Sequence, residues 1–235
     1  MKYTLYWFQI RENYSIASVL RLINSIPFDI DKDWGFRIES SEGGELVAKY
    51  ILKRELVDKV EDPFGNVIEQ NRTVYETFIF RVIEELNVVE LVNPGKRLGK
   101  FRRVFENNSF VSIKLLPLRI DFEKVRDTVS MNAKEINVLG VETGNFLIKS
   151  RTNCRATFSA LVDVQQDVDY FLGNREFSLE SMRVGVGFEN SDYIIDVFST
   201  GRVVLRVDPL LDNHRSLVVS LRRQLSKNEV SGLSM

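Results

Sequence analysis

Five positively charged side chains lie within eight residues, directly after a Pro-Gly break in the chain. They are Lys96, Arg97, Lys100, Arg102 and Arg103. Clustered lysine and arginine side chains neutralise phosphate groups, so this segment is a candidate for contact with a nucleic-acid backbone. With five such contacts, the logarithm of the binding constant would fall with the logarithm of the salt concentration at a slope of roughly −4 to −5. The alternative is a solvated helix face that links two lobes.

The densest group of carboxylates is formed by Asp163, Asp167 and Asp169. Carboxylate oxygens are the ligands that a hard cation such as Mg²⁺ prefers, but the same pattern is typical of a polar loop or helix start. The chain has one histidine, His214, and one cysteine, Cys154, so it lacks the usual zinc ligand sets. We expect no metal site, no cofactor and no catalytic residues.

The composition indicates an ordinary globular protein without a broad excess of positive charge. Hydrophobic residues make up 44% of the 235 residues, charged residues 28%, and the net charge is −1. No apolar run approaches the roughly 18 residues of a membrane-spanning helix. The N-terminal stretch is typical of a strand and not of a secretory signal, and a single cysteine fits a reducing compartment. We therefore expect a cytoplasmic protein that does not bind membranes.

The hydrophobic pattern predicts that residues 1–108 form a first α+β lobe. The elements expected in it are a strand over 2–10, a helix that starts at Asn13 or Ser15 and ends at Pro27, a hairpin of 34–39 with 45–56, a turn over 62–66, strands over 72–82 and 88–92, and a short helix after Pro94-Gly95.

Residues 109–226 repeat this plan, and residues 227–235 are predicted to form a flexible tail. The expected elements are a strand over 109–118, a helix capped by Asp121, strands over 135–141, 145–149, 155–164 and 183–188, a hairpin from Tyr193, and a helix that starts at Asp208-Pro209. Because strands and helices do not alternate along the chain, an antiparallel sheet with helices on one side is favoured over a parallel sheet.

Two segments with similar patterns suggest an internal duplication. The stretch FIFRVIEELNVVELVNP (78–94) matches YIIDVFSTGRVVLRVDP (193–209) with a shift of 115 residues. The shift superimposes Val82 on Val197, Val89 on Val204 and Pro94 on Pro209. We therefore expect one hairpin unit to occur once in each lobe.

The second hairpin has two possible registers, which differ in the length of its loop. A two-residue turn would pair Asp196 with Leu205 and mix polar with apolar side chains on one face. A three-residue loop with a bulge would pair Ser199 with Val203 and Val197 with Leu205. This register separates the faces, so we predict it.

In the predicted register, the second face of the hairpin is amphipathic. It carries Phe198 across from Val204, and Asp196 across from Arg206. A cross-strand pair of opposite charges contributes roughly 0.2–1 kcal/mol, whereas an unpaired buried carboxylate is unfavourable.

Residues 196–204 (DVFSTGRVV) resemble the strand–turn–strand of the TATA-box-binding protein repeat. That family is an internal duplication that forms a saddle, with helices above a curved antiparallel sheet. The resemblance implies that Phe198 occupies the position of a wedge phenylalanine, Arg202 the basic turn position, and Val204 the concave face. It implies that Ile83 and Val89 are their counterparts in the first lobe.

These observations predict a non-enzymatic nucleic-acid-binding protein, built as a two-lobed saddle and acting as a subunit of a larger complex. The residues expected to bind nucleic acid are Lys96, Arg97, Lys100, Arg102, Arg103, Phe198, Arg202, Val204 and Arg206. One alternative is a protein-interaction or scaffold subunit that uses the same sheet surface. A second is a Mg²⁺-dependent nuclease that uses Asp163 and Asp167.

Overall fold

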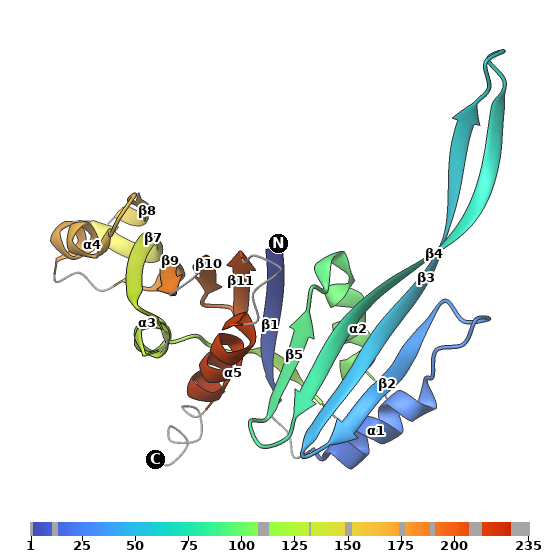
Figure 1. The fold of residues 1–235 in the computed structure, drawn as a ribbon, viewed down its shortest axis with the longest axis horizontal. Coiled ribbons are helices and arrows are strands. Elements are labelled where there is room, and N and C mark those ends of the chain that lie inside the picture. The colour runs from blue at the N-terminus through green and yellow to red at the C-terminus, as the bar shows by residue number, and fades with distance from the viewer. Residues whose placement is uncertain are drawn as a thin grey trace. The chain divides into compact units, whose positions relative to one another are not determined.

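The computed structural model has an α+β fold with antiparallel pairing between its strands (Figure 1). It describes residues 2–10, 14–107, 113–131, 133–148, 152–173, 177–188, 191–206 and 213–226. The chain divides into two compact units, one of residues 10–115 and the other of residues 1–9 with 116–235. The predicted class, α+β with an antiparallel sheet, is confirmed. None of the described helices is long and apolar enough to cross a membrane.

The unit of residues 10–115 contains a four-stranded sheet with the order β2-β3-β4-β5. Its elements are α1 (Ile16–Ser25), β2 (Trp34–Glu42), β3 (Glu45–Glu61), β4 (Val67–Ile83), β5 (Val88–Val92), the short 3-10 helix η1 (Gly95–Arg97) and α2 (Leu98–Glu106). Ser15, one of the two starts that the sequence left open, caps α1, and the β2–β3 turn lies at Gly43-Gly44 as predicted.

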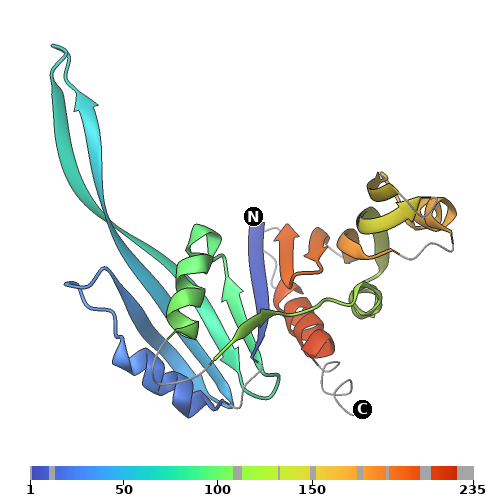
Figure 2. The ribbon, with the colours of Figure 1, turned by 180° about the vertical axis from the view of Figure 1, so that it is seen from behind.

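The strands β3 and β4 extend much further than the sequence pattern predicts. Each is 17 residues long, and a turn over residues 62–66 joins them. Pairing of β3 with β2 ends at Trp34–Leu52, and pairing of β4 with β5 ends at Ile79–Val92. Residues 53–75, which begin and end at the Lys53–Tyr75 pair, form a two-stranded projection that we call the β3–β4 arm (Figures 1 and 2).

An aromatic cluster holds α2 against the sheet of this unit. Phe101 on α2 lies 5.1 Å from Phe80 and 5.8 Å from Tyr50, measured between ring centroids, and stacks on Phe105 at 5.2 Å. Each such ring pair adds about 0.5–1.5 kcal/mol beyond its buried area. Burial also raises the pKa of Tyr50 to about 12. Figure 2 shows α1 and α2 on the same side of these strands.

The other unit contains a sheet with the order β1-β11-β10-β9-β7-β8. Its elements are β1 (Lys2–Ile10), β6 (Leu115–Pro117), α3 (Phe122–Ser130), β7 (Glu135–Ile148), β8 (Thr152–Ser159), α4 (Gln165–Leu172), β9 (Leu179–Phe188), β10 (Ser191–Phe198), β11 (Arg202–Arg206) and α5 (Asn213–Ser226).

Several predicted boundaries in this unit are wrong. The strands predicted over 135–141 and 145–149 are one strand, β7, with an irregular register near Thr143. The strand predicted over 155–164 ends at Ser159, because α4 begins soon afterwards. Of the strand predicted over 109–118, the described part contains only β6. The helix start at Asp208-Pro209 and the tail 227–235 lie outside the described residues.

One face of this sheet packs into a hydrophobic core with α3 and α5. The core-facing side chains of β9, β10 and β11 are buried, and α3 contacts β7, β9 and α5. The apolar residues concerned are Val184, Val186, Tyr193, Ile195, Val197, Val203 and Leu205 on the strands and Val125, Val129, Leu217 and Leu221 on the helices.

The observed register of the β10–β11 hairpin corrects the predicted one. Val197 pairs with Val203, and Asp196 pairs with Val204, so the loop is Ser199-Thr200-Gly201. A loop of this kind needs a left-handed residue at its third position, and Gly201 supplies it with φ of 78°. The predicted register would have placed Arg202 there. Because β11 shifts by two residues, each side chain keeps its predicted face.

The predicted duplication of this hairpin is not confirmed. The β4–β5 loop has four residues, Glu84 to Asn87, and Val82 pairs with Val89. A shift of 115 would place Val204 opposite Val197, whereas Val203 occupies that position. Because of this one-residue difference, a superposition of β4 on β10 leaves equivalent side chains of β5 and β11 on opposite faces.

Candidate nucleic-acid interface

A buried aspartate with two arginine partners lies on the face of the second sheet that points away from α3 and α5. Asp196 is 7% exposed. Its Oδ1 accepts a hydrogen bond from Nε of Arg183 at 2.6 Å, and its Oδ2 accepts one from Nη2 of Arg206 at 3.1 Å. The predicted ion pair of Asp196 with Arg206 is confirmed, although the two residues are diagonal neighbours and not directly opposite.

Sequence reasoning missed Arg183, which is directly opposite Asp196 on β9. Both arginine side chains remain 50% exposed, so the carboxylate is shielded while the guanidinium groups face solvent. The alternation of Arg183 with apolar Met182 and Val184 places it on the outer face. Its partner could be found only from the strand order.

Next to this triad, two aromatic rings flank a third arginine across three adjacent strands. Tyr6 on β1 is directly opposite Arg202 on β11. The guanidinium carbon of Arg202 lies 3.5 Å from the centroid of the Phe198 ring on β10. All three residues are half-buried. The contact of Arg202 with Phe198 is a cation–π arrangement, and Tyr6 lies on the neighbouring strand of the same row.

We call this surface the arginine face, defined by Tyr6, Arg183, Phe198, Arg202 and Arg206. The charged side chains that alternation places on this face of β1, β9, β10 and β11 are Lys2, Arg183, Arg202, Arg206, Asp192 and Asp196. Four positive and two negative charges leave a net charge of +2 in the region, on a chain whose total is −1.

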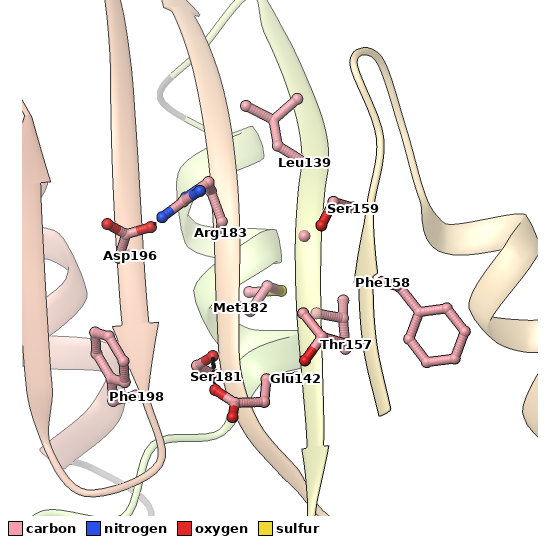
Figure 3. Close-up of a pocket in the computed structure, with 12 residues that line it drawn as sticks. Leu139, Glu142, Thr157, Phe158, Ser159, Ser181, Met182, Arg183, Asp196 and Phe198 are labelled. Carbon is pink, nitrogen blue, oxygen red and sulfur yellow. Dashed lines mark hydrogen bonds and ion pairs between the residues drawn. The ribbon is translucent and has the colours of Figure 1, made fainter. Parts of the chain in front are cut away.

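A shallow pocket of about 240 Å³ continues from Asp196 across β9 and β7 (Figure 3). Hydroxyl and carboxylate groups line it, and Ser181 donates a hydrogen bond to Glu142 at 3.2 Å. Figure 3 shows Arg183 and Asp196 pointing toward each other, while Phe158 points away from them. The volume is below the roughly 300–1,000 Å³ of typical small-molecule pockets. A single planar group fits these dimensions better than a large cofactor does.

The predicted hairpin residues differ in their accessibility. Phe198 and Arg202 are half-buried and Arg206 is exposed, so all three can contact a ligand. Val204 is on the same face but is only 5% exposed. The counterparts expected in the first lobe, Ile83 and Val89, are 7% and 0% exposed and lie in the other unit.

The basic segment 96–103 belongs to the unit of residues 10–115, and two of its arginines have partners within that unit. Nε of Arg97 donates to the carbonyl oxygen of Pro94 at 2.9 Å, and its guanidinium lies 5.9 Å from the Phe78 ring centroid. Nη2 of Arg102 donates to the carbonyl oxygen of Leu115 at 2.9 Å. These two side chains stabilise the ends of η1 and α2.

The other three cations of the segment are exposed on η1 and α2. They are Lys96, Lys100 and Arg103. Within the part of the chain that the structure describes, none of the three forms an ion pair with another side chain. Their exposure leaves them accessible to a ligand, and their contact with phosphates stays a prediction.

Two of the three carboxylates considered for Mg²⁺, Asp163 and Asp169, accept local hydrogen bonds. Asp163 accepts hydrogen bonds from the backbone N–H groups of Val138 at 3.0 Å and Gln165 at 2.7 Å. Asp169 accepts one from the Gln165 side chain at 3.1 Å. Among the described residues, no three His, Cys, Asp or Glu side chains are grouped so that they could hold a metal ion.

The single cysteine and the single histidine belong to other elements, β8 and α5. Cys154 is a half-buried free thiol on β8. His214 lies in α5, but its side chain is outside the described part of the structure. Comparison of the chain with protein-family models finds no match, and comparison with curated proteins finds none either.

Proposed function

We propose that this chain binds single-stranded nucleic acid on its arginine face. The row of Tyr6, Arg202 and Phe198 is the observation that carries the proposal, since bases stack on aromatic rings and guanidinium planes in this way. Arg183 and Arg206 flank the row and can contact phosphates. The adjacent pocket has the size for one planar base, with hydroxyl groups that can donate hydrogen bonds.

The accessibility of the apolar residues favours a single strand over a duplex wedge. A wedge needs an apolar side chain that projects between base pairs. Arg202 covers the Phe198 ring at 3.5 Å, and Val204 is buried. Neither apolar side chain, Phe198 or Val204, therefore projects from the face. The outer surface of Arg202 and the half-exposed Tyr6 ring instead suit stacking by unpaired bases.

The charge on the face predicts a moderate salt dependence. Three or four phosphate contacts by Lys2, Arg183, Arg202 and Arg206 would give a log-log slope of roughly −2 to −3 on a single strand.

Fluorescence anisotropy with labelled single-stranded RNA and DNA tests the proposal, with the duplex as competitor. Removing one stacking ring, in Tyr6→Ala, should weaken binding about 5- to 100-fold, since one stacked base contributes about 1–3 kcal/mol. Tyr6→Phe keeps the ring and is the matched control, with affinity close to that of the unaltered protein. Absence of binding at low salt, or equal effects of the two variants, would contradict the proposal.

A protein-interaction role is the second candidate, because an apolar patch is exposed around α4. Leu161 is 100% exposed, Tyr170 93% and Phe171 48%. Large apolar side chains grouped in this way often mark protein-binding surfaces. A stoichiometric partner that copurifies with the chain and is lost in Tyr170→Asp, but retained in Tyr6→Ala, would support this role.

A further inference from the structure

The outer edge of β3 in the β3–β4 arm has no neighbouring strand beyond Leu52 among the described residues. The Lys53 N–H donates to the carbonyl oxygen of Asp33 at 2.7 Å, so the backbone groups of Lys53 point to this edge. Because these directions alternate along a strand, the N–H and C=O groups of Glu55, Val57 and Lys59 point to the same open edge. Such an edge is a template for pairing with another strand.

The arm also exposes apolar side chains. Val57 is 54% exposed, Val60 47% and Phe64 89%. Cross-strand ion pairs, such as Lys59 with Glu69 at 3.0 Å, support the two strands. A two-stranded hairpin is nevertheless marginally stable in water, so pairing of its edge would stabilise it.

The sequence of this edge is complementary to itself. Residues 53–61, KRELVDKVE, carry three positive and three negative charges. If two copies pair antiparallel with Val57 opposite itself, Glu55 of each copy faces Lys59 of the other. Lys53 then faces Glu61 in the same way, which makes four pairs of opposite charge on one face of the sheet.

The neighbouring registers lack this complementarity. Centring the pairing on Leu56 would place Lys53 of each copy opposite Lys59 of the other, which offsets the pairs of Arg54 with Asp58. Centring it on Asp58 would place Asp58 opposite itself and Glu55 opposite Glu61. Like charges directly opposite one another destabilise a sheet, so the register centred on Val57 is selected.

We propose that two copies of this chain dimerise by antiparallel pairing of their β3 edges, in the register that sets Val57 opposite itself. The two arms then form a four-stranded sheet. On its second face, Leu56 of one copy is a diagonal neighbour of both Leu56 and Val60 of the other. The balanced charge of the strand and its matched register favour a second copy over an anionic ligand.

Sedimentation equilibrium with charge-reversal variants tests the register. The unaltered protein is expected to be a dimer, and Glu55→Lys or Lys59→Glu alone should each weaken dimerisation about tenfold or more, because each turns two attractive pairs into repulsive ones. A mixture of the two variants should recover dimers, since position 55 of each chain then faces a residue of opposite charge at position 59 of the other. A monomer at all concentrations, or a mixture no more dimeric than either variant, would overturn the proposal.

A disulfide cross-link tests the same register without changing the charges. In a Cys154→Ser background, Val57→Cys should form a covalent dimer on oxidation, since Cα atoms of a hydrogen-bonded pair lie about 5.5 Å apart, within disulfide range. Val60→Cys is the control, because its two copies would be about 20 Å apart in this register. Cross-linking of the control and not of Val57→Cys would overturn the register. Circular dichroism confirms that each variant is folded.

Discussion

Replacing Asp196 by asparagine should weaken the fold and tighten nucleic-acid binding at the same time. The carboxylate is nearly buried and accepts hydrogen bonds from Arg183 and Arg206. The amide keeps the shape of the side chain but removes its charge, so both guanidinium groups lose a counterion. The substitution should therefore lower the free energy of unfolding and raise the affinity for nucleic acid.

The stability change follows from the exposure of the two ion pairs. A hydrogen bond to a charged group contributes about 1.5–3 kcal/mol when shielded. Each arginine side chain is 50% exposed, so screening by solvent reduces each pair to about 0.5–1 kcal/mol. The loss of free energy of unfolding is then about 1–2 kcal/mol, which corresponds to a fall in Tm of about 2–8 °C for a chain of this size.

The binding change follows from the charge on the arginine face, which rises from +2 to +3. Removing a negative charge about 8 Å from a phosphate is favourable by about 0.5–1 kcal/mol at solvent-like dielectric constants, or two- to fivefold in affinity. Freed contacts by Arg183 and Arg206 should also steepen the salt slope by about 0.7–1.4.

Thermal unfolding followed by circular dichroism, and anisotropy titrations in a salt series, measure the two effects. Asp167→Asn is the matched control, because Asp167 is exposed on α4 and its loss changes the net charge of the chain equally. If Asp196→Asn lowers both stability and affinity, or tightens binding no more than Asp167→Asn does, the ligand does not bind on the arginine face.

Two further predictions concern the turns of the hairpins. Gly201→Ala should destabilise the second unit by about 2–3 kcal/mol in urea unfolding, because φ is 78° and a Cβ would lie 2.5 Å from the Trp7 carbonyl oxygen; an unchanged midpoint would contradict the observed loop. Hydrogen bonds from the side chain and backbone of Asn66 hold the pKa of Asp62 below its ordinary value. This stabilisation is present above the ordinary aspartate pKa and is lost as the pH falls through the lowered value. Hydrogen-exchange protection factors of the backbone amides at the arm tip should therefore fall in acid. In Asp62→Asn they should not depend on pH.

The sequence predicts most elements because their signals are local. β1 and β5 have the predicted bounds, Asp121 caps a helix as expected, and Ser15 is the helix cap of the two candidates, Asn13 and Ser15. The faces of the β10–β11 hairpin were also correct, because the alternation of Val197 and Asp196 is preserved when one strand shifts by two residues. The pairing register of this hairpin depends on which loop residue adopts the left-handed conformation. The pattern of charged and apolar residues did not show that this residue is Gly201.

Two important features could not be predicted because they depend on contacts distant in sequence. Tyr6 and Arg202 are almost 200 residues apart and become neighbours only because β1 pairs with β11. The length of the arm was underestimated for another reason. Beyond Leu56 its charged residues interrupt the apolar pattern that indicates a half-buried strand, since both faces are exposed.

The most direct test of nucleic-acid binding on the arginine face compares two charge reversals by anisotropy with a single-stranded oligonucleotide. Arg202→Glu and Lys100→Glu change the net charge of the chain equally, but one side chain stacks on Phe198 while the other is exposed on α2. Arg202→Glu should weaken binding at least about tenfold more than Lys100→Glu does, because it removes both a phosphate contact and a stacking surface. Equal losses, or a larger loss for Lys100→Glu, would contradict the account.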